Sequence, residues 1–263
     1  MKAVKVNLQR DLKCVELHTL SDLHLGDKHC DYKSILEHIK AIESNPNAYV
    51  ILNGDLINNA TTQSISDTYG ENLSPMEQLK KATELLKPIK EKILAITSGN
   101  HENRTYKTDG IDLTEILARE LGLDDRYAPE SVTLFLRVGE INKKHTNKPD
   151  LARQVCYTLF ITHGGGGGRR EGGKINRLID LASIVDVDIY IHSHTHLPAI
   201  LKQSFFRADN KNSVVTKVDK LFVNTNAWLN YGGYGEAQGY KPASIQTPII
   251  YLDGRKKGFT AKL

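Results

Sequence analysis

Hydrophobic runs along the first two thirds of the chain are each followed by a short polar signature. The runs are CVELHTL, AYVILN, ILAIT, VCYTLFI and VDVDIYI, whose β-branched and other apolar residues are typical of buried strands. The signatures are Asp22-Leu23-His24, Gly54-Asp55, Gly99-Asn100-His101-Glu102, Thr162-His163-Gly164 and His194-Thr195-His196. In open α/β sheets, ligand sites gather outside the carboxyl ends of strands. The pattern therefore predicts one site that is shared by five strand ends.

Amphipathic helical patterns separate these strands, which favours an α/β architecture with parallel pairing. We expect helices over residues 32–44, 75–87 and 112–121, and a fourth that begins near residue 173. After His196 the pattern changes to strands, at residues 199–206, 214–223, 248–252 and 258–263, with a hairpin turn starting at Asp253-Gly254. We expect these later strands to form a second sheet packed on the first, and residues 1–263 to form a single domain.

Composition and charge narrow the class of protein only slightly. The net charge is +4, and no apolar stretch approaches the ~20 residues that a membrane span needs. The first residues lack the apolar core of a secretory signal, and the three cysteines show no CxxC spacing. We therefore expect a cytoplasmic protein with no membrane association. Nothing in the sequence indicates the oligomeric state.

The polar signatures supply an unusual number of potential metal ligands. Seven side chains are candidates: Asp22, His24, Asp55, Asn100, His163, His194 and His196. Two of the signatures place ligands two residues apart, so in extended backbone each pair points to the same side. Asp55 is the natural anionic bridge between two divalent ions. Mixed nitrogen and oxygen ligation suits transition metals better than Mg²⁺ or Ca²⁺, so we expect two ions, Mn²⁺ first, with Fe, Zn, Co or Ni as alternatives.

The ordered set D-x-H, G-D, G-N-H-E, H and H-x-H resembles the calcineurin-like metallophosphoesterase superfamily. The resemblance extends from about Leu17 to Pro198. It implies an α/β fold, a four-layer α/β/β/α sandwich of two mixed sheets flanked by helices. It also implies a dinuclear metal centre and hydrolysis of a phosphoester substrate.

Carried over residue by residue, the resemblance assigns each ligand to a metal. One metal takes Asp22, His24, Asp55 and His196, and the other takes Asp55, Asn100, His163 and His194. His101 matches the position of the general acid that protonates the leaving-group oxygen. The nucleophile would be a hydroxide bridging the two metals.

The sequence departs from the superfamily pattern beside two of the motifs. Ser193 replaces the usual glycine before the last H-x-H. Protein Ser/Thr phosphatases carry Asp-Arg-Gly shortly after the bridging aspartate, but here Asp55 is followed by Leu-Ile-Asn-Asn. Asn58 therefore stands where those enzymes have a carboxylate that orients the catalytic histidine, and their phosphate-clamping arginine is missing. Arg104 resembles the arginine after their G-N-H-E motif and is a candidate substrate contact. We expect a phosphodiesterase rather than a protein phosphatase.

A nuclease similar to the repair-exonuclease branch of the same superfamily is the alternative enzyme, with nucleic acid as its partner. Between Arg137 and Arg177 there are nine Lys or Arg residues against three acids. Arg169 and Arg170 follow five glycines, 164–168, and are candidate substrate contacts. Aromatic residues on which bases could stack lie further along the chain: Trp228, Tyr231, Tyr234 and Tyr240. No coiled-coil segment or separate DNA-capping domain is evident.

A non-catalytic scaffold that keeps the fold is the alternative from a different class of function. Such proteins usually lose metal ligands or the acid. Here all seven ligand positions and His101 are retained, so the sequence favours an enzyme.

Overall fold

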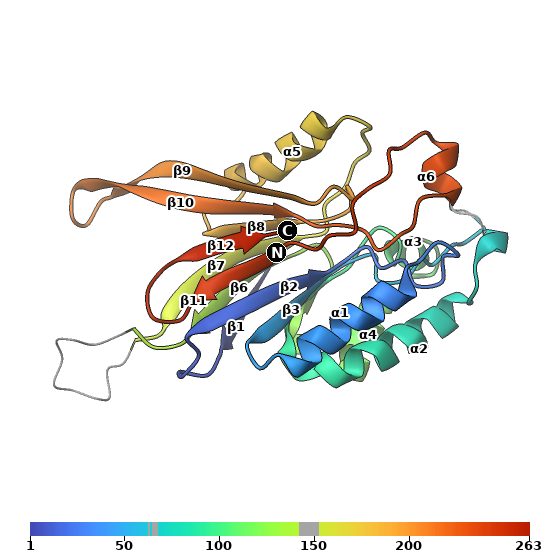
Figure 1. Cartoon of the computed structure of the whole chain (residues 1–263), viewed down its shortest axis with the longest axis horizontal. Helices are drawn as coiled ribbons and strands as arrows, with labels where there is room; N and C mark the ends of the chain where they lie inside the picture. Colours follow the sequence, from blue (N-terminus) through green and yellow to red (C-terminus); the bar gives the residue numbers. More distant parts are fainter. Residues whose placement is uncertain (63, 65–67, 142–152) are drawn as a thin grey trace.

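The computed structural model describes residues 1–62, 64, 68–141 and 153–263, and their strands form two mixed six-stranded sheets (Figure 1). In spatial order, the first sheet contains β1 (Lys2–Asn7), β6 (Ser131–Val138), β7 (Val155–Thr162), β8 (Ile189–His192), β10 (Val214–Asn224) and β9 (Ala199–Asp209). The second contains β12 (Phe259–Lys262), β11 (Ile249–Asp253), β2 (Cys14–Leu20), β3 (Ala48–Asn53), β4 (Ile93–Thr97) and β5 (Tyr127–Ala128).

All five predicted strands that precede the polar signatures are present. β2, β3 and β4 are parallel neighbours in the second sheet, and β7 and β8 are parallel neighbours in the first. β6 and β7 are antiparallel, so the first sheet is mixed. The expected strand ends are therefore divided between the two sheets, with three in one and two in the other.

The strands after His196 do not form a sheet of their own, contrary to the expectation from sequence. β10 pairs in parallel with β8, whereas β11 pairs antiparallel with β2. The reason lies in β10, which buries Leu221 against one face and Phe222 against the other. A strand buried on both faces lies in a sheet interior, and β10 runs between β8 and β9. The hairpin after Asp253 is confirmed, because β11 and β12 are antiparallel.

The described helices are α1 (Tyr32–Ser44), α2 (Pro75–Leu86), α3 (Asn103–Asp109), α4 (Leu113–Leu121), α5 (Glu171–Asp180) and α6 (Gly233–Ala237), with 3₁₀ turns at Thr68–Gly70, Lys87–Lys92, Asp124–Arg126 and Leu181–Ser183. Of these, α1, α2, α4 and α5 cover the outer faces of the sheets. The side chain of Asp31 caps α1 and that of Asp112 caps α4. Gly122 ends α4 in the left-handed conformation, with φ of 73°. No residue of α3 is buried, which explains why periodicity did not predict it.

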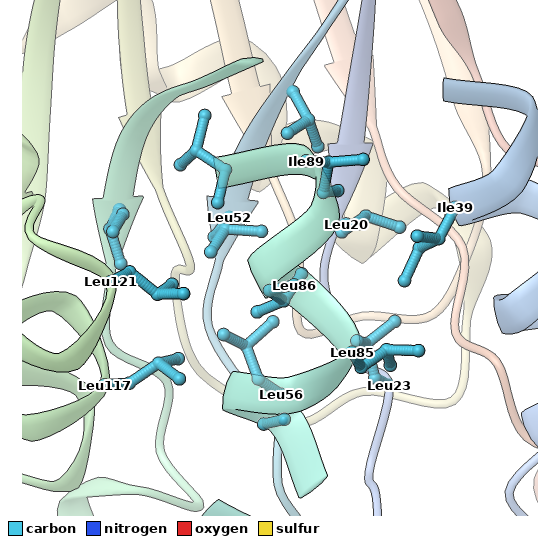
Figure 2. Close-up of a cluster of buried hydrophobic side chains, with 14 of the residues drawn as sticks. Leu20, Leu23, Ile39, Leu52, Leu56, Leu85, Leu86, Ile89, Leu117 and Leu121 are labelled. Atoms are coloured by element: carbon cyan, nitrogen blue, oxygen red, sulfur yellow. The ribbon is translucent and has the colours of Figure 1, made fainter. Parts of the chain in front are cut away.

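Three cores give the molecule four layers. α1, α2 and α4 pack on the second sheet through a cluster that includes Leu52, Leu86 and Leu117 (Figure 2). A second core, with Leu134 among its members, fills the space between the sheets. α5 covers the other face of the first sheet through Leu178 and its neighbours. Helices thus lie on opposite sides of the paired sheets (Figure 1), as the predicted α/β/β/α sandwich requires. Within the described part of the chain, no helix has the length and apolar character needed to span a bilayer.

Candidate metal centre

The candidate ligands lie just beyond the strands, and five of them have left-handed backbone. The φ angles are 50° at Asp22, 47° at His24, 51° at Asp55, 65° at His194 and 55° at His196. Non-glycine residues rarely adopt this conformation, which costs about 1–3 kcal/mol each and is concentrated at functional sites. The expected extended backbone at the two i, i+2 pairs is therefore wrong, although all five side chains still reach the site.

Three groups of side chains are each close enough to hold a metal ion, with their ligand atoms all within 4.8 Å of one another. The groups are Asp22–His24–His196, His24–Asp55–His101 and Asp55–His163–His194. Asp55 belongs to two of the groups, as a bridging ligand would. His194 and His196 fall into different groups. Asn100 is next to the third group, with its Oδ1 3.2 Å from Nε2 of His163.

The orientation of two histidines is set by contacts on the side away from the site. Nδ1 of His24 faces Oδ1 of Asn58 at 3.2 Å, and Nδ1 of His163 faces the backbone oxygen of Asn53 at 2.7 Å. Because each Nδ1 donates its proton outward, the neutral ring presents the Nε2 lone pair to the site. Nε2 of His24 lies 3.4 Å from Nε2 of His196. Such converging nitrogens are suited to metal coordination.

The electrostatics of the site also fit a bound cation. Oδ1 of Asp22 is buried and has no hydrogen-bond partner, although Nε2 of His196 lies 3.1 Å away. Burial alone would raise the pKa of Asp55, but the neighbouring His163 and His101 hold that pKa well below its usual value. Burial would lower the pKa of His163, but the charge of Asp55 outweighs it and raises the pKa to about 10. The buried carboxylates thus favour a positive charge where the two sheets meet. A bound divalent cation would supply it and displace the Nε2 proton of His163, and the donor set fits divalent transition metals.

Glu102 holds the two loops that carry Asp55 and Asn100. Its carboxylate accepts hydrogen bonds from the backbone N–H groups of Asp55 (3.0 Å), Leu56 (2.6 Å), Ile57 (3.2 Å) and Gly99 (2.9 Å). Burial and the charge of Asp55 raise its pKa to about 7. The sequence placed Glu102 in a motif without giving it a role. Four converging backbone donors supply one.

His101 lies beside Asp55, with its Nε2 3.8 Å from Oδ2 of the aspartate. Its Nδ1 is 2.7 Å from the backbone oxygen of Asn58, and its Nε2 is 3.0 Å from Nη2 of Arg104. Burial and Arg104 lower its pKa, while Asp55 opposes them. The sequence predicted that replacing a carboxylate by Asn58 removes the group that orients this histidine. Instead, the backbone carbonyl of the same residue takes that place.

Two asparagines at strand ends support the ligand loops, and one of them, Asn53, connects the two sheets. The Asn53 amide donates to the backbone oxygen of Thr162 (2.9 Å) and to Oγ of Ser193 (2.6 Å). Ser193, which replaces a glycine of the superfamily pattern, thus gains a contact across the sheets. Asn224 accepts from Nδ1 of His192 at 2.8 Å, so His192 supports the loop instead of belonging to a metal group. In the sequence, the feature that marks both asparagines is their position at the end of a hydrophobic run.

The glycine segment 164–168 is exposed, as are Arg169 and Arg170. Gly164 has φ of 86°, and a Cβ there would lie 2.1 Å from Nε2 of His192, so a larger residue would collide. The Arg177 guanidinium donates to the backbone oxygens of Gly165 (2.5 Å) and Gly167 (3.0 Å).

The basic region and the aromatic residues further along the chain have different surroundings. Lys174, in the basic region between Arg137 and Arg177, donates to the backbone oxygen of Thr195 at 2.8 Å. Trp228 is buried in the helix-covered core, whereas Tyr231 is exposed. Part of the basic region between Arg137 and Arg177, residues 142–152, lies outside the described residues.

Comparisons with known proteins identify the family of the chain. A family model for calcineurin-like phosphoesterases matches residues 20–198, more than half of the chain. Among solved structures, a predicted phosphoesterase from Streptococcus pneumoniae has 14% identity and a TM-score of 0.38, covering 95% of this chain and 88% of its own. A Vps29 double mutant from Entamoeba histolytica has 13% identity and a TM-score of 0.41, with coverages of 94% and 90%. The search of curated proteins gave no match.

The two-sheet sandwich and its clustered Asp and His residues define a metal-binding α/β protein of the phosphoester hydrolase class. The chain belongs to the calcineurin-like phosphoesterase family.

Proposed function

We propose that the chain is a dinuclear metal-dependent phosphodiesterase. The observation that carries this proposal is the pair of Asp–His groups, Asp22–His24–His196 and Asp55–His163–His194. His24 also groups with Asp55, so the two sets are adjacent. We assign Asp55 as the bridging ligand and Asn100 as the remaining ligand of the second ion. A scaffold has no need of such buried, strained ligand residues.

The residues around His101 support its assignment as the general acid. When bound, the two ions would supply an activated water nucleophile and polarise the phosphoryl oxygens. The Asn58 carbonyl fixes Nδ1 of His101 and leaves Nε2 to exchange a proton with the leaving group. Arg104 now contacts that Nε2 at 3.0 Å. We infer that Arg104 turns to a phosphoryl oxygen when substrate binds, which frees Nε2 of His101 to carry the transferred proton.

The cationic groups near the site favour a diester over a monoester. Asn59 occupies the position of the clamping arginine, and its amide donates inward to the backbone oxygen of His101 and to Oγ1 of Thr105. Lys174 is held by a backbone oxygen. Arg104 is therefore the part-buried cation adjoining His101, and one guanidinium matches the single charge of a diester better than the double charge of a monoester.

A metal-reconstituted panel of substrates tests this proposal. With Mn²⁺, we expect kcat/KM for an aryl phosphodiester to exceed that for the matching monoester by about tenfold or more. This factor corresponds to the free energy of one hydrogen bond to a charged group. Metal-free protein with the same substrates is the control, and Fe, Zn, Co and Ni are compared with Mn²⁺. A preference for the monoester would contradict the diester assignment, and inactivity with every metal would favour the scaffold.

The exposed pair Arg169 and Arg170 favours nucleic acid as a second candidate substrate, because it follows the glycine segment next to His163. If the diester is DNA or RNA, the double variant R169Q/R170Q should weaken binding equally for all sequences. The slope of log K against log salt should decrease by about one unit for each lost phosphate contact. The matched control is R10Q/K13Q, which removes two exposed charges just before the amino end of β2. Equal weakening by both variants, or no binding at low salt, would exclude this role for Arg169 and Arg170.

A further inference from the structure

We propose that Glu71 is a positioning residue for the metal ligand His24, acting through the side chain of Asn58. Glu71 precedes α2 and lies outside every motif of the sequence. Its carboxylate lies between two side-chain amides, those of Asn58 and Gln78. This inference rests on the proposed metal site, and it concerns which atom of the His24 ring is presented to that site.

The carboxylate accepts one hydrogen bond from each amide. Nδ2 of Asn58 donates to Oε1 of Glu71, and Nε2 of Gln78 donates to Oε2. Both amides are buried, with Asn58 3% and Gln78 0% exposed. Oδ2 of Asp27 lies on the same side of Asn58, 3.4 Å from Nδ2. The NH₂ end of the Asn58 amide is therefore surrounded by carboxylate oxygens.

An acceptor between two amides fixes the direction of both. An ionised carboxylate accepts hydrogen bonds but cannot donate them, so each amide must turn its NH₂ group toward Glu71 and its oxygen away. Oδ1 of Asn58 consequently faces Nδ1 of His24 at 3.2 Å. Oε1 of Gln78 accepts the backbone N–H of Asn59 at 2.8 Å. The His24 proton is thereby held on Nδ1, and Nε2 keeps the lone pair that a metal requires.

The surrounding backbone is arranged to keep Gln78 in this position. Its Nε2 also donates to the backbone oxygen of Leu73 at 2.8 Å. Gly26 has φ of 106°, and a Cβ there would lie 2.2 Å from Nε2 of Gln78, so only glycine leaves room for the amide. The backbone N–H of Asn72 donates to the oxygen of Gly26 at 2.8 Å. The loop after β2 and the segment before α2 thus enclose the carboxylate and both amides.

Replacing Glu71 by glutamine keeps the size of the side chain but removes its acceptor-only character. In Glu71→Gln, one NH₂ group must face the NH₂ group of Asn58 or of Gln78, so one of these amides turns round or separates. The Gln78 amide is held in its direction by Asn59 and Leu73 as well. The conflict therefore falls on Asn58, whose oxygen is then no longer held toward His24. We expect the ion bound by Asp22, His24 and His196 to bind about 10–100-fold more weakly, the usual effect of losing a partner of a ligating histidine.

The exchange variant E71Q/Q78E restores the direction of the Asn58 amide. The carboxylate introduced at position 78 would accept from the backbone N–H of Asn59 and from the amide introduced at position 71. The oxygen of that new amide would then accept from Nδ2 of Asn58. Net charge and side-chain size are unchanged. We expect Co²⁺ affinity to return to within about fivefold of wild type, because the exchange removes the hydrogen bond to Leu73. The control is Glu84→Gln, the same change at an exposed position of α2.

The test is a Co²⁺ titration of each metal-free protein, followed by visible absorption. Nitrogen-15 NMR of the histidine rings gives an independent readout of the proton on His24, and thermal unfolding checks folding. The proposal requires that His24 carry its proton on Nδ1 in the wild type. In E71Q this proton should leave Nδ1 and Co²⁺ should bind more weakly. Both properties should recover in E71Q/Q78E, and neither should change in E84Q. Wild-type affinity in E71Q, or no recovery in a folded exchange variant, overturns it. If wild type binds no Co²⁺, the proposed function itself fails.

Discussion

Asp55→Asn is expected to abolish phosphoester hydrolysis and to remove both metal ions. The change deletes one negative charge from a buried residue that lies in two of the three candidate metal groups. Without that charge, two divalent ions would be held close together with no anionic bridge. Asparagine is also the least disruptive replacement, because it tolerates the left-handed φ of 51° at this position. Its Oδ1 can still accept the backbone N–H of His101, which now donates to Asp55 at 2.9 Å.

Elemental analysis after metal loading, combined with thermal unfolding of the metal-free protein, measures this effect. The matched control is His24→Ala, which should mainly weaken one ion because the Asp55–His163–His194 group stays intact. A folded Asp55→Asn protein that still carries two ions would show that Asp55 is not the bridge.

His101→Ala is expected to keep both ions and to reduce turnover by about 10²–10⁴-fold, the range typical of general acid catalysis. His101 adjoins Asp55, but its Nε2 faces Arg104 and its Nδ1 faces a backbone oxygen. An alkoxide leaving group needs a proton, so the loss should be largest for an alkyl ester. An aryl leaving group of low pKa needs less protonation and should lose less.

Steady-state rates on a series of diesters with leaving groups of different pKa distinguish these effects. The control is the metal content of each preparation. Release of an ion by His101→Ala would identify the residue as a ligand, and an equal loss for all leaving groups would exclude it as the proton donor.

Sequence patterns predicted the elements whose burial follows a simple period. The five strands before the motifs and the helix Tyr32–Ser44 are present as expected, because each has a continuous or regularly spaced apolar face. The sheet that each later strand joins was not predictable in this way. The sequence predicted a strand at residues 214–223, and only tertiary packing on both faces places that strand between β8 and β9.

The candidate ligands could be found by residue type, but the groups that support them could not. Asn58 contributes a backbone oxygen to His101, and such a contact depends on backbone direction, not on the side chain. Glu71 is far from every motif in sequence. Left-handed backbone at Asp22 and His196 also contradicts local preference, and such exceptions are expected where function constrains the chain.

The position of the ligands has a consequence for folding. His196 follows a strand of the first sheet and groups with Asp22 from the second, while His163 and His194 group with Asp55 in the same way. Ions bound in these groups would connect two layers that are otherwise joined by an apolar core and by side-chain contacts such as those of Asn53 and Tyr157. Because such ions bind the assembled sandwich and not its separate halves, each would add to the free energy of unfolding, by about 4 kcal/mol when the free ion is a thousand times its Kd. Metal supply would then change the stability of the folded chain as well as its chemistry.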